Sequence, residues 1–129
     1  MSGAPQSVAL SRIGQISVNV HDLDRAVVFY RDLLGMKLLF QVPGLAFFDC
    51  GGIRLMLSPP ERPEYDHPGS VLYYKVEDIR AAHDELVGRG VSFQSAPHLI
   101  ARMPDHDLWM GFFKDSEGNT LALMSEVRG

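Results

Sequence analysis

Residues 22–36 read Asp-Leu-Asp-Arg-Ala-Val-Val-Phe-Tyr-Arg-Asp-Leu-Leu-Gly-Met. Asp22 can accept hydrogen bonds from the free N–H groups of a first helical turn. Gly35 is a residue type that commonly ends helices. Between the two, one apolar face follows helical spacing and consists of Leu23, Ala26, Val27, Tyr30 and Leu34. The stretch therefore predicts a helix that begins after Asp22 and runs to about Leu34.

The residues on either side of this helix predict strands. Polar and apolar residues alternate from Gln15 to Val20, as in a strand with one buried face. After the helix come three strand-like runs, which are separated by Pro-Gly and Gly-Gly turns and cover residues 36–42, 45–50 and 53–58. The first part of the chain, about residues 12–58, is thus predicted to form a strand, a helix and three strands.

The same order recurs in the second half of the chain. Val20-His21-Asp22-Leu23 reappears as Val76-Glu77-Asp78-Ile79, which indicates a repeated structural unit. A helix is expected from Ile79 to about Gly88, and an irregular stretch is expected up to Asp107. The predicted strands cover residues 71–76, 91–94, 108–114 and 120–125. The second unit therefore spans about residues 70–126, and the proline-rich residues 59–69 form a linker.

The repeat and the overall composition together predict the fold class. We expect an α+β protein in which two tandem βαβββ units form a curved mixed sheet around a shared cavity, with the helices on the outer face. The chain has 129 residues, of which 46% are hydrophobic and 22% are charged. These values fit one globular domain over residues 1–129.

Charge and composition also exclude several function classes. The net charge of −4, with scattered basic residues, lacks the positive patch that nucleic-acid binding requires. No apolar run approaches the ~20 residues needed to cross a bilayer, so we expect no membrane partner. Cys50 is the single cysteine, and residues 1–12 lack the apolar core of a secretory signal. We therefore expect a cytoplasmic, reducing location.

Two motifs resemble a known family. The motif at residues 22–36 and the sequence Phe-Phe-Lys-Asp-Ser-Glu-Gly-Asn at residues 112–119 resemble the vicinal oxygen chelate superfamily. This superfamily includes glyoxalase I, the bleomycin-resistance proteins, fosfomycin-resistance enzymes and extradiol dioxygenases. The resemblance covers roughly residues 12–126. It implies the tandem βαβββ fold, a divalent metal in the enzymes of the family, and a homodimer.

The resemblance also says where family enzymes carry their metal ligands. The equivalent positions of this chain lie in the first and last strand of each unit and hold Gln15, Met56, Val71 and Ala122. Divalent cations prefer carboxylate, imidazole or thiolate ligands, and the side chains of valine, alanine and methionine supply nothing comparable. Among these four residues only Gln15, through its amide oxygen, could coordinate a metal. A one-residue shift of the fourth strand would bring Arg54 or Ser58 to the site, and neither completes a metal shell. We expect no metal and no other cofactor here.

Strand alternation predicts which side chains face the cavity. The leucine pairs 55/57 and 121/123 mark the core side, because a one-residue slip would turn leucines into the cavity. The opposite side carries Gln15, Ser17, Asn19, Met56, Ser58, Val71, Tyr73, Lys75, Ala122 and Met124. The Tyr73 hydroxyl could orient a ligand, or it could bond to a neighbour in the cavity wall. The set is apolar with a few polar anchors, as is typical of small-molecule pockets.

Residues 97–109 form the most chemically dense stretch. In a functional interpretation it forms the cavity rim, where His98 or His106 carries a proton or binds a metal. Arg102 would then pair with an anionic group, and Trp109 would stack on a flat substrate. In a structural interpretation the same residues form a polar surface loop. No residue is assigned a catalytic role, because the local sequence contains no nucleophile and base pattern.

Three functions remain open from the sequence. The first is a metal-free family member that binds a small, partly aromatic or amphipathic molecule, as bleomycin-resistance proteins bind their drug. The alternative is a divalent-metal-dependent lyase or dioxygenase of the glyoxalase type that uses His98, His106 or a residue placed elsewhere. The third is a structural or partner-binding domain without a ligand. In each case the linker permits the two units to close on each other or on those of a partner chain.

Overall fold

The computed structural model describes residues 8–128. The first unit consists of β1 (Gln15–Asn19), α1 (Leu23–Val28), η1 (Phe29–Leu33), β2 (Lys37–Val42), β3 (Leu45–Cys50) and β4 (Ile53–Ser58). The second unit consists of β5 (Leu72–Lys75), α2 (Ile79–Gly88), β6 (His98–Arg102), β7 (Asp107–Lys114) and β8 (Thr120–Val127). A short 3₁₀ turn, η2 (Pro63–Tyr65), lies in the linker between them. The order strand, helix, three strands therefore occurs twice.

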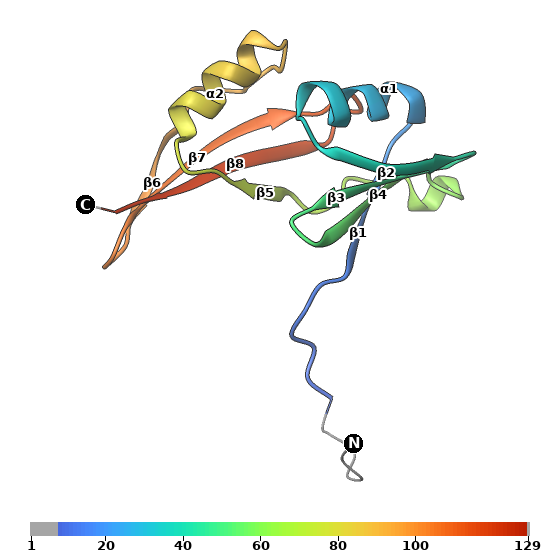
Figure 1. Cartoon of the computed structure of the whole chain (residues 1–129), viewed down its shortest axis with the longest axis horizontal. Helices are drawn as coiled ribbons and strands as arrows, with labels where there is room; N and C mark the ends of the chain where they lie inside the picture. Colours follow the sequence, from blue (N-terminus) through green and yellow to red (C-terminus); the bar gives the residue numbers. More distant parts are fainter. Residues whose placement is uncertain (1–7, 129) are drawn as a thin grey trace.

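Each unit forms its own four-stranded sheet with the same strand order. Within residues 8–128 the orders are β1-β4-β3-β2 and β5-β8-β7-β6. In both sheets the first strand pairs in parallel with the last strand, and the other neighbours are antiparallel. Both helices lie on the same side of the two sheets (Figure 1). This confirms the predicted α+β fold of two tandem βαβββ units, with the mixed sheet divided in two where the units meet.

The helix predicted from Asp22 to about Leu34 is present, but its geometry changes halfway. The Asp22 carboxylate accepts a hydrogen bond from Arg25 N at 3.0 Å and caps the helix as predicted. From Phe29 onward the chain forms a π-helical turn, in which Leu34 N donates to Phe29 O at 3.0 Å. Gly35, with a φ of +74°, follows the helix. No helix within residues 8–128 is long and apolar enough to cross a membrane.

The second unit departs from the prediction between α2 and β7. Residues 91–94, predicted as a strand, contain only an isolated bridge between Phe93 and Phe113. The strand equivalent to β2 is instead β6, in the stretch predicted to be irregular. Val91 is buried and its N–H donates to Leu86 O at 2.9 Å, so this residue closes the end of α2 and the strand starts later. Both β2 and β6 contain a register shift at corresponding places, which supports their equivalence.

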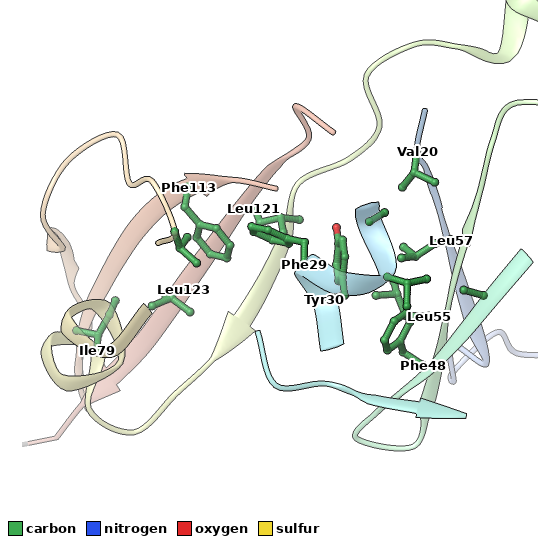
Figure 2. Packing of buried hydrophobic residues seen from close by; sticks show 14 residues of the cluster. Val20, Phe29, Tyr30, Phe48, Leu55, Leu57, Ile79, Phe113, Leu121 and Leu123 are labelled. Atoms are coloured by element: carbon green, nitrogen blue, oxygen red, sulfur yellow. The ribbon is translucent and has the colours of Figure 1, made fainter. Parts of the chain in front are cut away.

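One hydrophobic core lies on the helix side of the sheets and extends from one unit into the other (Figure 2). The predicted leucine pairs belong to it, since Leu55, Leu57, Leu121 and Leu123 are all at most 4% exposed. Because neighbouring residues of a strand point to opposite faces, the residues between these leucines face away from the helices. We call the side of both sheets away from the helices the open face.

Candidate functional site

The first sheet places Ser17, Met56 and Phe47 side by side on the open face. Gln15 lies beside them, with its Nε2 3.8 Å from the Met56 Sδ. Its Oε1 accepts a hydrogen bond from Arg54 Nε at 3.0 Å. The Arg54 guanidinium also lies over the Phe47 ring, 5.4 Å from the ring centroid. The Gln15 amide oxygen, the candidate metal donor of this sheet, is therefore engaged with a positively charged group.

The second sheet places Tyr73, Ala122 and Phe112 side by side in the same way. Tyr73 is 46% exposed, and its ring meets that of Phe112 edge to face with the centroids 6.0 Å apart. Ala122 is fully buried, and Met124 follows it on the same face. Val71 lies directly before β5. Neither Val71 nor Ala122 has a side-chain atom that binds a divalent cation.

The metal implied by the family resemblance does not fit these positions. Together they offer one engaged amide, one thioether and two alkyl groups, which are poor ligands for hard or borderline cations. No group of three His, Cys, Asp or Glu side chains suited to hold a metal ion occurs elsewhere in residues 8–128. The chemistry of the site is therefore that of an apolar surface with polar edges.

A hollow of about 870 Å³ lies where the two units meet. Its walls come from β1, the end of the linker, the start of β5 and β8, and the turn between β7 and β8. Three of the predicted cavity residues, Ser17, Asn19 and Val71, line it together. The other residues predicted to face the cavity from the strands do not line it; they are Gln15, Met56, Ser58, Tyr73, Lys75, Ala122 and Met124. Apolar side chains of both units, among them Val18 and Leu121, form part of its wall. Its volume lies in the range of small-molecule pockets, about 300–1000 Å³.

The β7–β8 turn carries a buried carboxylate that contacts the first unit. The Glu117 side chain is fully buried, and its carboxylate accepts hydrogen bonds from His21 N at 2.8 Å and Asp22 N at 2.7 Å. Arg25 Nε donates to the same carboxylate at 2.7 Å. Burial raises the pKa of Glu117, but the bonds from Arg25 and from the backbone outweigh burial and lower this pKa to about 2. Glu117 thus holds the start of α1 as an anion.

Two neighbours of Glu117 extend this contact. The buried Asp115 carboxylate accepts hydrogen bonds from Tyr30 Oη at 2.7 Å and from Asn119 N and Nδ2, both at 2.8 Å. Asn119 Nδ2 also donates to Asn19 O of β1 at 2.9 Å. Burial, followed by the negative charge of Asp115, raises the pKa of the Tyr30 hydroxyl. The turn therefore fixes β1, α1 and η1 relative to the second sheet, and with them one wall of the hollow.

The opposite wall is held by polar contacts between β1 and the linker. Asn19, which pairs with Ser58 at the end of β1, donates from Nδ2 to Tyr65 O at 2.7 Å. His21 Nε2 lies 2.9 Å from Asp66 Oδ1. Both contacts hold the linker against the end of β1. The hollow is therefore bordered by a segment that the sequence had indicated only as a spacer between units.

Two predicted rim residues lie on the other side of the sheet. Trp109 pairs with Ser125 and shares its face with the buried core, and the Arg80 guanidinium of α2 lies 5.4 Å from its ring centroid. Arg102 pairs with Asp107 on this same face and donates to its carboxylate at 3.0 Å. The predicted position of Trp109 and Arg102 at the cavity rim is thus wrong, because the pairing of β6, β7 and β8 turns both side chains toward the helix side.

The two histidines of this stretch lie at separate places. His98 pairs with Met110 on the open face, at the outer edge strand β6. His106 is 14% exposed, with its Nδ1 2.7 Å from Asp105 Oδ1 and its Nε2 3.8 Å from Glu126 Oε2. Glu126 belongs to the end of β8 that lies far from the hollow. Neither histidine lines the hollow, so residues 97–109 do not form its rim.

Comparison with known proteins supports the assignment of this fold. The lactoylglutathione lyase structure from Agrobacterium tumefaciens matches with a TM-score of 0.69 and 22% identity, over 90% of this chain and 94% of that one. TnmS3, an antibiotic binding protein from Streptomyces sp. CB03234, matches with a TM-score of 0.73 and 26% identity, over 93% and 99% of the two chains.

A curated relative matches over a shorter part of its own length. The metallothiol transferase FosB from Staphylococcus haemolyticus is 27% identical over 111 residues, which make up 84% of this chain and 63% of the relative. The chain thus spans less than two thirds of that protein. The family model of the Glyoxalase/Bleomycin resistance protein/Dioxygenase superfamily matches residues 12–123, so the chain belongs to this superfamily, as the vicinal oxygen chelate resemblance predicted.

Proposed function

We propose that this chain binds a small, partly aromatic or amphipathic molecule in the hollow between its two units, without a metal ion at the positions that family enzymes use. The observation that carries the proposal is the hollow itself, with a volume of about 870 Å³ and walls from both units. Its lining combines apolar side chains, such as Val18, Val71 and Leu121, with polar and charged ones, such as Asn19, Lys114 and Asn119. Small-molecule sites combine the same two kinds of surface.

The side chains at the metal positions support a binding role rather than a metal-dependent reaction. Met56 lies beside Phe47 in the first sheet, and Ala122 lies beside Tyr73 and Phe112 in the second. None of these five side chains lines the hollow, so they count against a metal-dependent reaction on the open face and do not themselves form the proposed binding site. The likeness to TnmS3, an antibiotic binding protein, agrees with a binding role.

Metal analysis tests the proposal against the alternative of a divalent-metal-dependent lyase or dioxygenase. Protein purified without chelators should contain far less than one equivalent of Mn, Fe, Ni or Zn per chain. A stoichiometric amount of any of these metals would contradict the proposal and favour the enzyme. The likeness to FosB, a metallothiol transferase, makes this measurement the first one to perform.

A blocking substitution tests whether the hollow is the binding site. Val71→Trp should fill part of the hollow and weaken the binding of aromatic compounds identified by a thermal-shift screen. Val127→Trp, at a 45% exposed position at the end of β8, is the matched control and should leave that binding unchanged. Equal binding by both variants would place the ligand elsewhere.

We also propose that the chain pairs as a homodimer. Tyr73 on the open face and Phe40 on the edge strand β2 are 46% and 47% exposed, and Ile100 on the edge strand β6 is 45% exposed. A partner chain would cover such apolar side chains and unpaired strand edges. Light scattering coupled to size exclusion should give twice the chain mass of 14.3 kDa. The cytoplasmic location remains a prediction of the sequence.

A further inference from the structure

We infer that the hollow between the units takes a ligand with an apolar body and one anionic group, and that Lys114 holds the anionic group. The inference rests on the proposed function above, because it concerns the same hollow. It names a chemical class of ligand and a specificity-determining residue.

The charges around the hollow carry the inference. Lys114 lines it and donates from Nζ to Thr120 Oγ1 at 2.7 Å. Among residues 8–128 the Lys114 ammonium makes no ion pair, so it has donor capacity left for a ligand. The two carboxylates of the lining are both engaged, Asp66 with His21 at 2.9 Å and Glu117 with Arg25 at 2.7 Å. Lys114 therefore presents to the hollow a positive charge that no carboxylate of the described residues pairs with.

Two other basic residues of the sheets, Lys75 and Arg54, differ from Lys114 in this respect. Lys75, on the open face of β5, pairs with Glu126 at 3.2 Å. Arg54 donates to Gln15 at 3.0 Å and lies over a phenylalanine ring. Because these groups already have partners, binding an anion would require them to give up existing contacts. Lys114 loses little when it binds an anion, since its present partner is a neutral hydroxyl.

The rest of the lining defines the body of the ligand. Val71, Leu72 and Leu121 contribute apolar surface, and Ser17 and Gly69 leave room beside it. A volume of about 870 Å³ suits a molecule of drug size. A ligand with an aromatic or long aliphatic body and a carboxylate, sulfonate or phosphate would bury its body here and present its charge to Lys114.

Two dyes that differ by a single sulfonate group test this inference. The anionic probe is 1-anilinonaphthalene-8-sulfonate, and the neutral probe is N-phenyl-1-naphthylamine; both are titrated into the full chain by fluorescence. The wild type should bind the sulfonate dye about 5- to 10-fold more tightly than the neutral dye, as expected for a charge-assisted hydrogen bond at a partly exposed site. Lys114→Met should abolish this preference.

Two further variants make the outcome decisive. Lys37→Met changes the net charge by the same amount on β2, the outer edge of the first sheet, and should keep the preference for the sulfonate dye. Val71→Trp should weaken the binding of both dyes. Circular dichroism and Tm of each variant show whether it is folded.

The possible failures are distinguishable. If the wild type binds both dyes equally, or if Lys114→Met retains the preference, the anionic ligand class is wrong while the binding role of the hollow stands. If neither dye binds, or if Val71→Trp has no effect on either, the hollow is not a binding site, and the proposed function fails together with this inference.

Discussion

The two hairpins that correspond to each other in the repeat end in turns with different roles. The β3–β4 turn consists of Gly51 and Gly52, both with positive φ, and Gly52 N donates locally to Asp49 Oδ1 at 3.2 Å. The β7–β8 turn is longer, and it buries the carboxylates of Asp115 and Glu117 against the first unit. Of these two equivalent turns, only the β7–β8 turn makes these buried polar contacts with the other unit. The interface between the two units is therefore asymmetric.

The largest expected effect comes from removing the buried carboxylate. Glu117→Ala leaves the N–H groups of His21 and Asp22 without their partner and should lower the free energy of unfolding by about 2–4 kcal/mol. Asp49→Ala, in the equivalent turn, removes a single exposed hydrogen bond and should cost about 0.5–1 kcal/mol. Urea unfolding monitored by circular dichroism measures both. Equal losses would show that the two turns have the same importance.

Acid should weaken the same contact. The pKa of Glu117 is lowered from 4.5 to about 2 in the folded chain, so its stabilisation is complete above pH ~5 and is lost as pH falls toward 2. Because Arg25 is about half exposed, we expect this loss to be about 1–2 kcal/mol rather than the full value of the shift.

The measurement is urea unfolding of the wild type, Glu117→Gln and Asp105→Asn from pH 6 to pH 2.5. The pKa of the exposed Asp105 is also lowered to about 2, by Arg128 and then by His106. Asp105→Asn therefore shows how much the loss of an exposed carboxylate with a similar pKa changes the pH dependence of stability. Glu117→Gln should have the flatter profile of the two variants. If the free energy of unfolding of Glu117→Gln falls with pH as steeply as that of the wild type, the Glu117 carboxylate does not cause the acid sensitivity.

A smaller effect is expected at the hydroxyl that meets Asp115. Tyr30→Phe removes one of several donors to this carboxylate and should lower the free energy of unfolding by about 1 kcal/mol. Tyr65→Phe, at a 51% exposed position in the linker, is the control and should be neutral. Thermal unfolding distinguishes the two, and a neutral Tyr30→Phe would mean that the contact adds no net stability.

The smallest losses of stability are expected from removing the two cation–π pairs, one in each unit, and they should be similar. Arg80 over Trp109 and Arg54 over Phe47 both place a guanidinium 5.4 Å from a ring centroid. The loss of each pair should cost about 0.5–1 kcal/mol, as expected for an exposed cation–π contact. Because Arg54→Ala also removes the hydrogen bond to Gln15, Gln15→Ala is measured beside it to separate the two contributions. A loss confined to one of the two variants, seen in urea unfolding, would extend the asymmetry of the turns to the rest of the scaffold.

Local patterns were sufficient to predict the scaffold. The helix caps Asp22 and Asp78 accept hydrogen bonds from Arg25 N and Ala81 N, both at 3.0 Å, as their positions before the helices implied. Strands β3 and β4 have the predicted ends, because glycine turns delimit them on the sequence. These features depend on neighbouring residues, and the chain sequence specifies them directly.

Features that depend on distant residues were missed. β6 was not predicted, because His98 to Arg102 contains a bulge that interrupts the alternation and lies between prolines. Trp109 lay within the predicted strand 108–114, but it was grouped with the loop-like residues before it, so the alternation of that strand was not applied to its side chain. The partners of Glu117 lie more than 90 residues away, although two acidic residues in one glycine-containing turn were a usable signal. Ser17 and Val71 were assigned to a shared cavity, and both line the hollow.

The distance along the chain between Glu117 and its partners has a consequence for synthesis. The N–H groups of His21 and Asp22 donate to the carboxylate of Glu117, which lies 96 and 95 residues later in the chain. During translation the first unit is synthesised before Glu117, so α1 first forms without this acceptor for its N–H groups. The nascent first half therefore remains less stable than the finished domain, and its folding is completed only when the last hairpin arrives.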